Sequence, residues 1–398
     1  MTKLQSLAIF GATPLFDHPI PKGQRFFPAW AQYEAMFRDI FERQYYTNHG
    51  PLAQELERRL GERLSVRHAM CVTNEFIGLA LAGQALGVRG NVVVPAHAFI
   101  ATPQSLSWTD ARPLFCDVAA ETGMMTAELV APLLSREPVS AILAVNPWGD
   151  ACDVQGLQTL ADQYGIPLYL DSANGFGCAI SGRPVGSFGA IEVISFHSDN
   201  ILGACEGGVI CTQSDELAAR IRNMRSNYGM GPPVPVIKTG NGRMSEAQAA
   251  VALFNLDHYP EYQKRNERLF GMFRTGLAGI PGLEVRVPSG VSESNYQNLI
   301  CLVDEATLGV RRDDLWQILR AENLLAGRGF YPALHQASPA AWASPANGLP
   351  HTEGYCARTI EFPMNHALAE ADLAKTIDLL GSIQQNASVI RHRLAELT

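Results

Sequence analysis

The chain of 398 residues is long enough for one large and one smaller domain, each with its own hydrophobic core. Hydrophobic residues make up 47% of it and charged residues 18%, which is typical of a compact soluble protein of enzyme size. The net charge of −8 and the lack of any basic run argue against nucleic acid or an anionic membrane surface as the main partner.

The N-terminus and the cysteines favour a cytoplasmic protein. Gly11, Pro14 and Asp17 interrupt the first apolar residues too early for a signal peptide. No apolar run reaches the roughly 18 residues that a membrane helix requires. The eight cysteines are scattered singly, with no Cys-x-x-Cys pair, so reduced buried thiols are expected and a metal site is not.

Strand-like and helix-like runs alternate through the first part of the chain. Leucines at helical spacing predict a helix over 51–65. Apolar runs predict buried strands over 92–95, 141–146, 167–171, 192–196 and 208–212. Helical patterns lie between several of them, over 76–87, 126–136, 153–164 and 214–225. This alternation predicts an α/β domain with a mostly parallel sheet and helices on both faces.

The pattern changes after the last of these helices. Residues 226–242 are rich in Gly and Pro and predict a long loop, which in a compact protein is often functional. We expect an N-terminal segment over 1–50, a large domain over 51–255 and a smaller C-terminal domain over 256–398. The smaller domain is predicted to contain strands near 283–287 and 297–303 and helices over 311–322 and 368–383.

Ligands of such sheets bind at the carboxyl ends of the strands. Asp171 ends an apolar strand, and the loops that carry His97 and His197 follow two others. A single aspartate at this place could equally cap a helix. The surrounding motifs decide between these readings.

Six segments occur in an order and at a spacing that resemble one family. They are Tyr45–Pro51, Pro95–Thr102, Gly182–Phe188, Ser195–His197, Glu206–Gly208 and Gly240–Glu246. From about Tyr45 to Tyr331 the chain resembles the DegT/StrS sugar aminotransferases, which depend on pyridoxal phosphate (PLP). The resemblance implies the PLP-transferase fold of type I, with a seven-stranded sheet and a smaller α+β domain. It also implies a homodimer with shared active sites.

The resemblance also implies roles for individual residues around the cofactor. Asp171 would pair with the pyridine nitrogen and keep it protonated, so that the ring can withdraw electrons. Phe99 would stack on the ring, and Asn174 would lie near the ring hydroxyl. Ser195, together with Asn241 of the neighbouring subunit, would bind the phosphate.

The chain departs from the family where the cofactor is attached. Relatives have a lysine that holds PLP as a Schiff base, and here the run after His197 continues Ser198, Asp199, Asn200. An amide nitrogen is not nucleophilic and carries no proton between substrate and cofactor, so Asn200 removes both the anchor and the acid–base group. Ordinary transamination is therefore not expected.

The phosphate-binding segment departs as well. Relatives begin the helix after the first strand with Ser-x-Gly-Thr, and here Glu75 and Phe76 stand in that segment. Two unit charges about 4 Å apart repel by roughly 4 kcal/mol at an effective dielectric of 20. A helix N-terminus attracts an anion by only about 0.3–2 kcal/mol. If Glu75 points inward and is ionised, repulsion dominates.

The remaining candidates are acid–base and substrate residues. Carboxylates and imidazoles that suit proton transfer without PLP are Glu75, His97, Asp171, His197 and Asp199. Lys238 is the only lysine that could replace the missing amine, because it lies just before Asn241, although a solvated loop lysine is the favoured interpretation. Candidates for substrate contact are Trp148, Lys238, Tyr331 and His335.

Three functions remain open at this stage. The first is a biosynthetic enzyme that acts on a nucleotide sugar or natural-product intermediate by acid–base chemistry, with no covalently bound cofactor. The second binds PLP or pyridoxamine phosphate (PMP) noncovalently, as the similar sugar 3-dehydratases do. The third is a non-catalytic partner of an active homologue.

Overall fold

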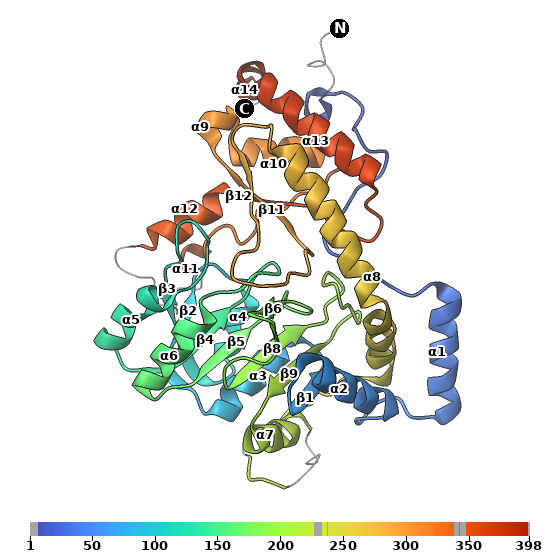
Figure 1. The fold of residues 1–398 in the computed structure, drawn as a ribbon, viewed down its shortest axis with the longest axis vertical. Coiled ribbons are helices and arrows are strands. Elements are labelled where there is room, and N and C mark those ends of the chain that lie inside the picture. The colour runs from blue at the N-terminus through green and yellow to red at the C-terminus, as the bar shows by residue number, and fades with distance from the viewer. Residues whose placement is uncertain (1–6, 227–232, 237, 338–341, 343–347, 397–398) are drawn as a thin grey trace.

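A seven-stranded sheet forms the centre of the large domain in the computed structural model, which describes residues 7–226, 233–236, 238–337, 342 and 348–396 (Figure 1). Its strands, in spatial order, are β1 (His68–Val72), β9 (Gly208–Thr212), β8 (Ile191–Ser195), β5 (Leu168–Asp171), β4 (Val139–Val145), β2 (Arg89–Pro95) and β3 (Asp110–Cys116). The five strands from β8 to β3 are parallel, and β9 runs antiparallel to both of its neighbours. The predicted α/β class with a mostly parallel sheet is confirmed.

Helices cover both faces of this sheet because its strands are apolar on both faces. Val92 and Val94 pack in the core on one face, and Val93 packs in the core on the other, as the two-residue period of a strand requires. Helices α3 (Glu75–Leu86) and α7 (Asp215–Arg225) contribute to the first core, and α5 (Ala127–Arg136) and α6 (Val154–Tyr164) to the second. The short helix α4 (Ala101–Leu106) follows β2, and α2 (Pro51–Leu64) packs in a third core.

A three-stranded antiparallel sheet forms the smaller domain. Its strands are β10 (Leu283–Val285), β11 (Leu299–Val303) and β12 (Thr359–Phe362). The helices of this part of the chain are α9 (Glu305–Leu308), α10 (Arg312–Ala321), α11 (Leu334–Ala337), α12 (Pro350–Arg358), α13 (Glu370–Gln385) and α14 (Ala387–Ala395). Leu7 and Phe16 lie in the core of this domain, so the N-terminal segment packs there.

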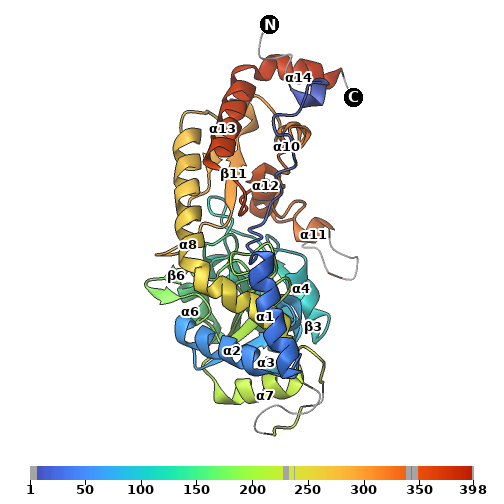
Figure 2. The same ribbon diagram turned by 90° about the vertical axis from the view of Figure 1, so that its right-hand side faces the viewer.

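Helix α8 (Glu246–Leu277) is 32 residues long and runs from the large domain to the smaller one (Figure 2). The side chain of Ser245 accepts a hydrogen bond from the Gln248 N–H and so caps the helix. The predicted boundary between residues 255 and 256 lies inside this helix, because one continuous helix contributes side chains to both cores.

Helix α1 (Trp30–Arg43) lies along α8 and has one buried residue, Ile40. Among the described residues, no helix is both long and apolar enough to cross a membrane. The same residues contain no group of three His, Cys, Asp or Glu side chains placed to hold a metal ion.

Candidate active site

A cavity of about 530 Å³ opens at the carboxyl ends of the parallel strands, between the two domains. Asp171 reaches it from the end of β5, and Asn298, the residue before β11, reaches it from the smaller domain. Most of the residues predicted for the site line it, namely Glu75, Phe99, Trp148, Asp171, Asn174, Ser195, His197, Asp199 and Asn200. The topological rule that placed Asp171 at a ligand site therefore agrees with the geometry.

Glu75 and Asp171 form a hydrogen-bonded pair of carboxyl groups inside this cavity. Asn74 caps α3 by accepting a hydrogen bond from the Ile77 N–H at 2.9 Å, which makes Glu75 the first residue of the helix. Burial raises the pKa of Glu75 well above its ordinary value, and the neighbouring charge of Asp171 raises it further. Two carboxyl groups can share a hydrogen bond only when one carries a proton, so the pair holds a proton between them.

Asp171 is held from two further directions. Its Oδ2 accepts a hydrogen bond from the Thr102 hydroxyl at 2.5 Å, and its Oδ1 accepts one from the Ala173 N–H at 3.1 Å. The side chain is 4% exposed, and this burial raises its pKa although the hydrogen bonds from Thr102 and Ala173 oppose the shift. One oxygen of Glu75, Oε1, is buried and has no hydrogen-bond partner among the described residues.

Asn200 is fixed by amide groups on both sides. Its Oδ1 accepts hydrogen bonds from Asn174 Nδ2 at 2.9 Å and from Gln297 Nε2 at 3.2 Å. Its Nδ2 donates to the Ser195 carbonyl at 3.4 Å, and the residue is 7% exposed. This network gives Asn200 a structural anchorage, since both ends of its carboxamide are used within the protein.

Of the two residues expected to bind a phosphate, only Ser195 lines the cavity of its own chain. Ser195 lines the cavity, and its hydroxyl oxygen accepts a hydrogen bond from the His197 N–H at 3.2 Å. Asn241 is exposed, does not line the cavity of its own chain, and accepts a hydrogen bond from Arg243 at 3.0 Å. A phosphate at the N-terminus of α3 would come next to the Glu75 carboxyl group.

Two predicted acid–base residues lie at the open side of the cavity. The side chains of His197 and Asp199 are 47% and 45% exposed. His197 lies 3.8 Å from Glu206, and Asp199 forms an ion pair with Arg25 at 3.2 Å. Water screens both pairs, so neither side chain is held as firmly as Asp171.

The prediction for His97 needs a correction, because its ring does not line the cavity. It is enclosed by the rings of Trp148, Phe330 and Tyr355, with centroids 4.9–5.1 Å away. Its Nδ1 contacts the Gly123 carbonyl oxygen at 2.8 Å, while Nε2 is buried without a partner among the described residues. Burial lowers the pKa of His97 to about 4, so the ring is neutral at physiological pH.

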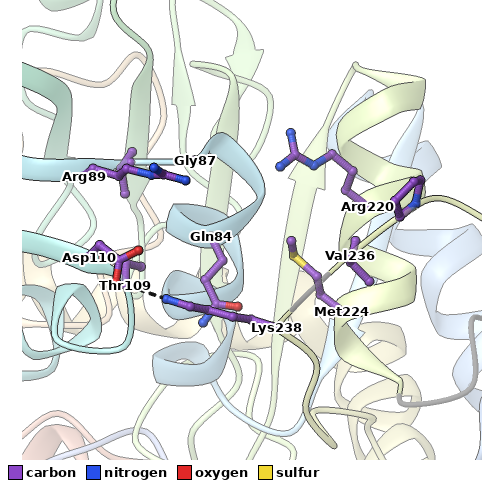
Figure 3. A pocket seen from close by; sticks show the side chains of 11 residues that line it. Gln84, Gly87, Arg89, Thr109, Asp110, Arg220, Met224, Val236 and Lys238 are labelled. Carbon is purple, nitrogen blue, oxygen red and sulfur yellow. Dashed lines mark hydrogen bonds and ion pairs between the residues drawn. The ribbon is translucent and has the colours of Figure 1, made fainter.

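Lys238 does not line the large cavity of its own chain, and its predicted place is in the site of the partner subunit. It lines a separate cavity of about 310 Å³, where it pairs with Asp110 at 3.4 Å (Figure 3). Arg89 and Asp110 stand at the first residues of β2 and β3, so this cavity faces the opposite end of the parallel strands. Of the predicted loop around Lys238, residues 227–232 and 237 lie outside the described part of the chain.

Tyr331 and His335 contact other parts of the protein and do not line the large cavity. The Tyr331 ring packs on the guanidinium groups of Arg312 and Arg328, at 4.3 and 5.2 Å. His335 is buried, and its Nε2 lies 2.8 Å from a carboxylate oxygen of Glu353. The neighbouring Phe330 lines the cavity and stacks on Trp148 at 4.8 Å.

Lys22 is a cavity residue that the sequence motifs do not predict. Together with Glu361 and Asn298 it lines the cavity on the side of the smaller domain. Its ammonium group pairs with the Glu361 carboxylate, which also accepts a hydrogen bond from Asn298 at 3.0 Å. The segment around Lys22 matches no family motif, so only the folded chain shows that the residue belongs to the site.

The described lining is acidic. Its carboxyl groups are those of Glu75, Asp171, Asp199, Glu206 and Glu361. Lys22 is the one lysine or arginine among the described residues of this lining. Glu361 already neutralises it, which leaves the Glu75–Asp171 pair as the buried charge without a cationic partner in the cavity.

The fold and the position of this cavity define a protein with the architecture of the PLP-dependent aminotransferases. The model of the DegT/DnrJ/EryC1/StrS aminotransferase family matches residues 31–380. The chain belongs to that family.

Relatives of known activity support the same class. The chain is 30% identical over 319 residues to the dTDP-4-amino-4,6-dideoxy-D-glucose transaminase of Shigella dysenteriae, covering 80% of this chain and 86% of the relative. The transaminase of the same description from Escherichia coli is 29% identical over 321 residues, covering 80% and 85%. The chain is thus an enzyme-family member related to sugar transaminases.

Solved structures agree over nearly the whole chain. A structure of DesI in the presence of its TDP-sugar product has a TM-score of 0.91 at 36% identity and covers 98% of this chain and 100% of that one. DesV of S. venezuelae, in complex with a ketimine intermediate, has a TM-score of 0.80 at 27% identity and covers 90% and 94%. These relatives make PLP or PMP the natural cofactor to test in this cavity.

Proposed function

We propose that this chain moves protons on a nucleotide-linked keto sugar with its own side chains and does not transaminate. The observation that carries the proposal is the position of Glu75 and Asp171, two adjacent buried carboxyl groups that line a large cavity. Raised pKa values bring carboxyl groups closer to neutral pH, where they exchange protons most effectively.

Asn200 supports the same proposal from the side of the cofactor. By resemblance it stands at the lysine position, and both ends of its carboxamide are bound within the protein. PLP would need Asp171 for its ring nitrogen, and here the carboxyl group of Glu75 already bonds to that side chain. Its phosphate would need the N-terminus of α3, where Glu75 and Phe76 stand in the segment that relatives fill with small and hydroxyl-bearing residues. These residues do not fit the cofactor in the family's usual arrangement.

The relatives point to the substrate class. The curated relatives carry the name of a dTDP-linked amino sugar, and DesI was solved with a TDP-sugar product. Replacing the amine of such a sugar by oxygen gives a 4-keto sugar, whose carbon atoms next to the carbonyl carry acidic protons. A carboxylate in the cavity can remove such a proton and a carboxylic acid can return one, and neither step requires an imine.

Solvent deuterium tests the proposal whatever the final product of the reaction is. Purified protein is incubated with dTDP-4-keto-6-deoxy-D-glucose in D₂O, and mass spectrometry follows deuterium incorporation at the carbons next to the carbonyl. We expect catalysed incorporation without added PLP or PMP. Incorporation no faster than in a protein-free sample would rule out the proposed reaction on this substrate class.

Noncovalent binding of PLP or PMP is the second candidate, and the position of Phe99 favours it. The Phe99 side chain lines the cavity and is 61% exposed, so its face is available to a flat ring. Titration calorimetry with PLP and with PMP separates the two candidates. Binding in the micromolar range, followed by faster turnover of the keto sugar, would favour the cofactor-dependent enzyme over the proposed one.

Helix α1 supports a homodimer as the assembly. Trp30 and Phe41 are 74% and 61% exposed, and ring contacts connect the aromatic side chains along the helix. Exposed aromatic rings in one row are typical of a protein–protein interface. A mass near twice that of the chain in light scattering, lost in Phe41→Glu, would support this proposal. A monomer that assembles only with an active homologue would instead favour the non-catalytic partner.

A further inference from the structure

The N-terminal segment 20–25 forms part of the cavity wall, although it lies far in sequence from the other lining residues. Lys22 and Gly23 line the cavity beside Asp199 and Asn200. Backbone hydrogen bonds join Gln24 to Asp199 and Arg25 to Ser198, at 2.9 and 3.0 Å. The segment therefore borders the stretch of chain where relatives carry their catalytic lysine.

Buried polar contacts hold this segment in place. Gln24 is fully buried, and its amide group donates to the carbonyls of Gln297 and Met364 at 2.8 and 3.0 Å. Ile20 bonds to the backbone of Asn323 and Leu325 at 2.8 and 3.0 Å. Because both flanks of Lys22 are fixed, its side chain enters the cavity from a rigid wall.

The side chain of Lys22 is oriented as well. Its ammonium group pairs with Glu361, and the two side chains are 39% and 11% exposed. A methyl group on Gly327 would lie 2.8–3.0 Å from the end of the lysine side chain, so the missing side chain at 327 leaves room for it. An oriented ammonium group needs little rearrangement to donate a further hydrogen bond, because it carries three donors.

We propose that Lys22 is a catalytic residue that donates a hydrogen bond to the carbonyl oxygen of the bound keto sugar. This inference rests on the proposed function and names the group that would stabilise the carbonyl oxygen during proton transfer. Lys22 enters from the side of the smaller domain, and Glu75 and Asp171 enter from the large one, so a sugar in the cavity lies between them.

The reaction balances with these groups alone. The ionised carboxyl group of the pair takes a proton from the carbon next to the carbonyl, and that C–H bond breaks. Its electron pair forms the new carbon–carbon double bond, and the carbonyl π electrons move to oxygen, where the Lys22 ammonium group stabilises the negative charge. Return of a proton to the same carbon restores the ketone, with deuterium in place of hydrogen when the solvent is D₂O.

The test compares Lys22→Met with wild type in the deuterium assay, using Lys264→Met as the matched control. Lys264 is exposed and lies outside the cavity lining. We expect Lys22→Met to lower kcat for exchange about 100-fold and to change KM less than about threefold, as loss of one donor to a developing oxyanion does. Lys264→Met should stay within about twofold of wild type.

A second variant separates catalysis from folding. Lys22→Met leaves the buried carboxylate of Glu361 without its cation, so Lys22→Met/Glu361→Gln removes both charges together. We expect the double variant to unfold at the wild-type temperature and still to lack exchange. Lys22→Ala should recover part of its exchange when ethylammonium is added, which a purely structural lysine would not allow.

The outcomes are distinguishable. If wild type exchanges and Lys22→Met exchanges equally fast, the role of Lys22 is wrong while the proposed function stands. Loss of exchange that parallels loss of folding in every Lys22 variant, with no amine rescue, also overturns it. If wild type itself does not exchange, the proposed function fails and the role of Lys22 falls with it.

Discussion

His97 and Asp171 occupy similar places in the fold and have opposite surroundings. His97 comes two residues after β2, and Asp171 is the last residue of β5, at the same edge of one parallel sheet. Three aromatic rings enclose His97, whereas Asp171 meets a second carboxyl group and opens to a cavity of about 530 Å³.

A position at the carboxyl edge of a parallel sheet is therefore not enough to make a residue part of a ligand site. Burial disfavours the charged form of both residues, so it lowers the pKa of His97 and raises that of Asp171. A histidine kept neutral among apolar rings has no partner with which to exchange a proton. A carboxyl pair that already shares one proton next to an open cavity does.

The largest expected effect is on exchange activity. Glu75→Gln keeps a hydrogen-bond donor beside Asp171 but cannot give up a proton, and Asp171→Asn removes the other carboxylate. We expect each to lower kcat for deuterium exchange between about 100-fold and 10,000-fold, which is the usual contribution of a general acid or base. His97→Phe should retain exchange within about fivefold.

The opposite result would contradict the assignment of proton transfer to the carboxyl pair. Exchange that survives Glu75→Gln and Asp171→Asn but disappears in a folded His97→Phe protein would assign the chemistry to the enclosed histidine. Circular dichroism of each variant provides the folding control for this comparison.

Trp148 separates the two regions, and its removal should cost the most stability. Its side chain is 7% exposed, stacks on Phe330 and contacts His97 at ring-centroid distances of 4.8 and 4.9 Å. Truncation of a buried tryptophan to alanine typically costs about 3–5 kcal/mol. We therefore expect Trp148→Ala to lower the free energy of unfolding in urea by that amount.

The same variant should also erase the difference in accessibility. Once water enters from the cavity, the pKa of His97 should rise from about 4 towards the ordinary histidine value. Titration of the imidazole protons by NMR measures this shift. Trp148→Phe is the control that keeps an aromatic wall, and an unchanged His97 pKa in Trp148→Ala would show that Trp148 is not the barrier.

The strands of the large sheet show what the sequence could and could not predict. Periodic apolar runs predicted five strands of the large sheet and the edge where Asp171 lies, because burial on both faces leaves a strong local signal. β1 and β3 at the two edges of the sheet, and α1 and α4, were not predicted. β3 contains Asp110, Arg112 and Pro113 and so lacks a continuous apolar run.

The site itself divides in the same way. Ser195 lies within a motif that resembles the family, Asn200 follows that motif at the spacing of the family's lysine, and Asp171 was identified from the end of an apolar strand. The enclosure of His97 and the entry of Lys22 depend on contacts between residues more than 200 positions apart, such as His97 with Phe330 and Lys22 with Glu361. Sequence periodicity carries no information about such contacts.

The pH dependence of stability should differ in sign between the two regions. The pKa of Glu75 is raised on folding, so its contribution is complete below the ordinary glutamate value of about 4.3 and is lost as pH rises through the folded value. The pKa of His97 is lowered on folding to about 4, so its contribution is lost as pH falls from about 6.5 through 4.

Urea unfolding between pH 4 and 9 measures both changes in stability: the loss of the Glu75 contribution as pH rises and the loss of the His97 contribution as pH falls. Glu75→Gln should become more stable relative to wild type as pH rises, because the amide donates to Asp171 without a proton to lose. His97→Phe should reduce the loss of unfolding free energy at acid pH, by up to about 3 kcal/mol for the full pKa shift. Parallel stability curves for Glu75→Gln and wild type would contradict the shared proton.

The smallest effect concerns the hydroxyl group that holds Asp171 in its ionised form. Thr102 is fully buried and donates to Asp171 Oδ2 at 2.5 Å, which opposes the upward shift of the Asp171 pKa. Thr102→Val has nearly the same shape and lacks this donor, so the carboxyl pair should hold its proton more tightly. We expect the pH at which kcat for exchange rises to move upward by less than about one pH unit. Thr102→Ser keeps the hydroxyl and should retain the wild-type profile, and a downward shift in Thr102→Val would mean that Asp171 is not the titrating base.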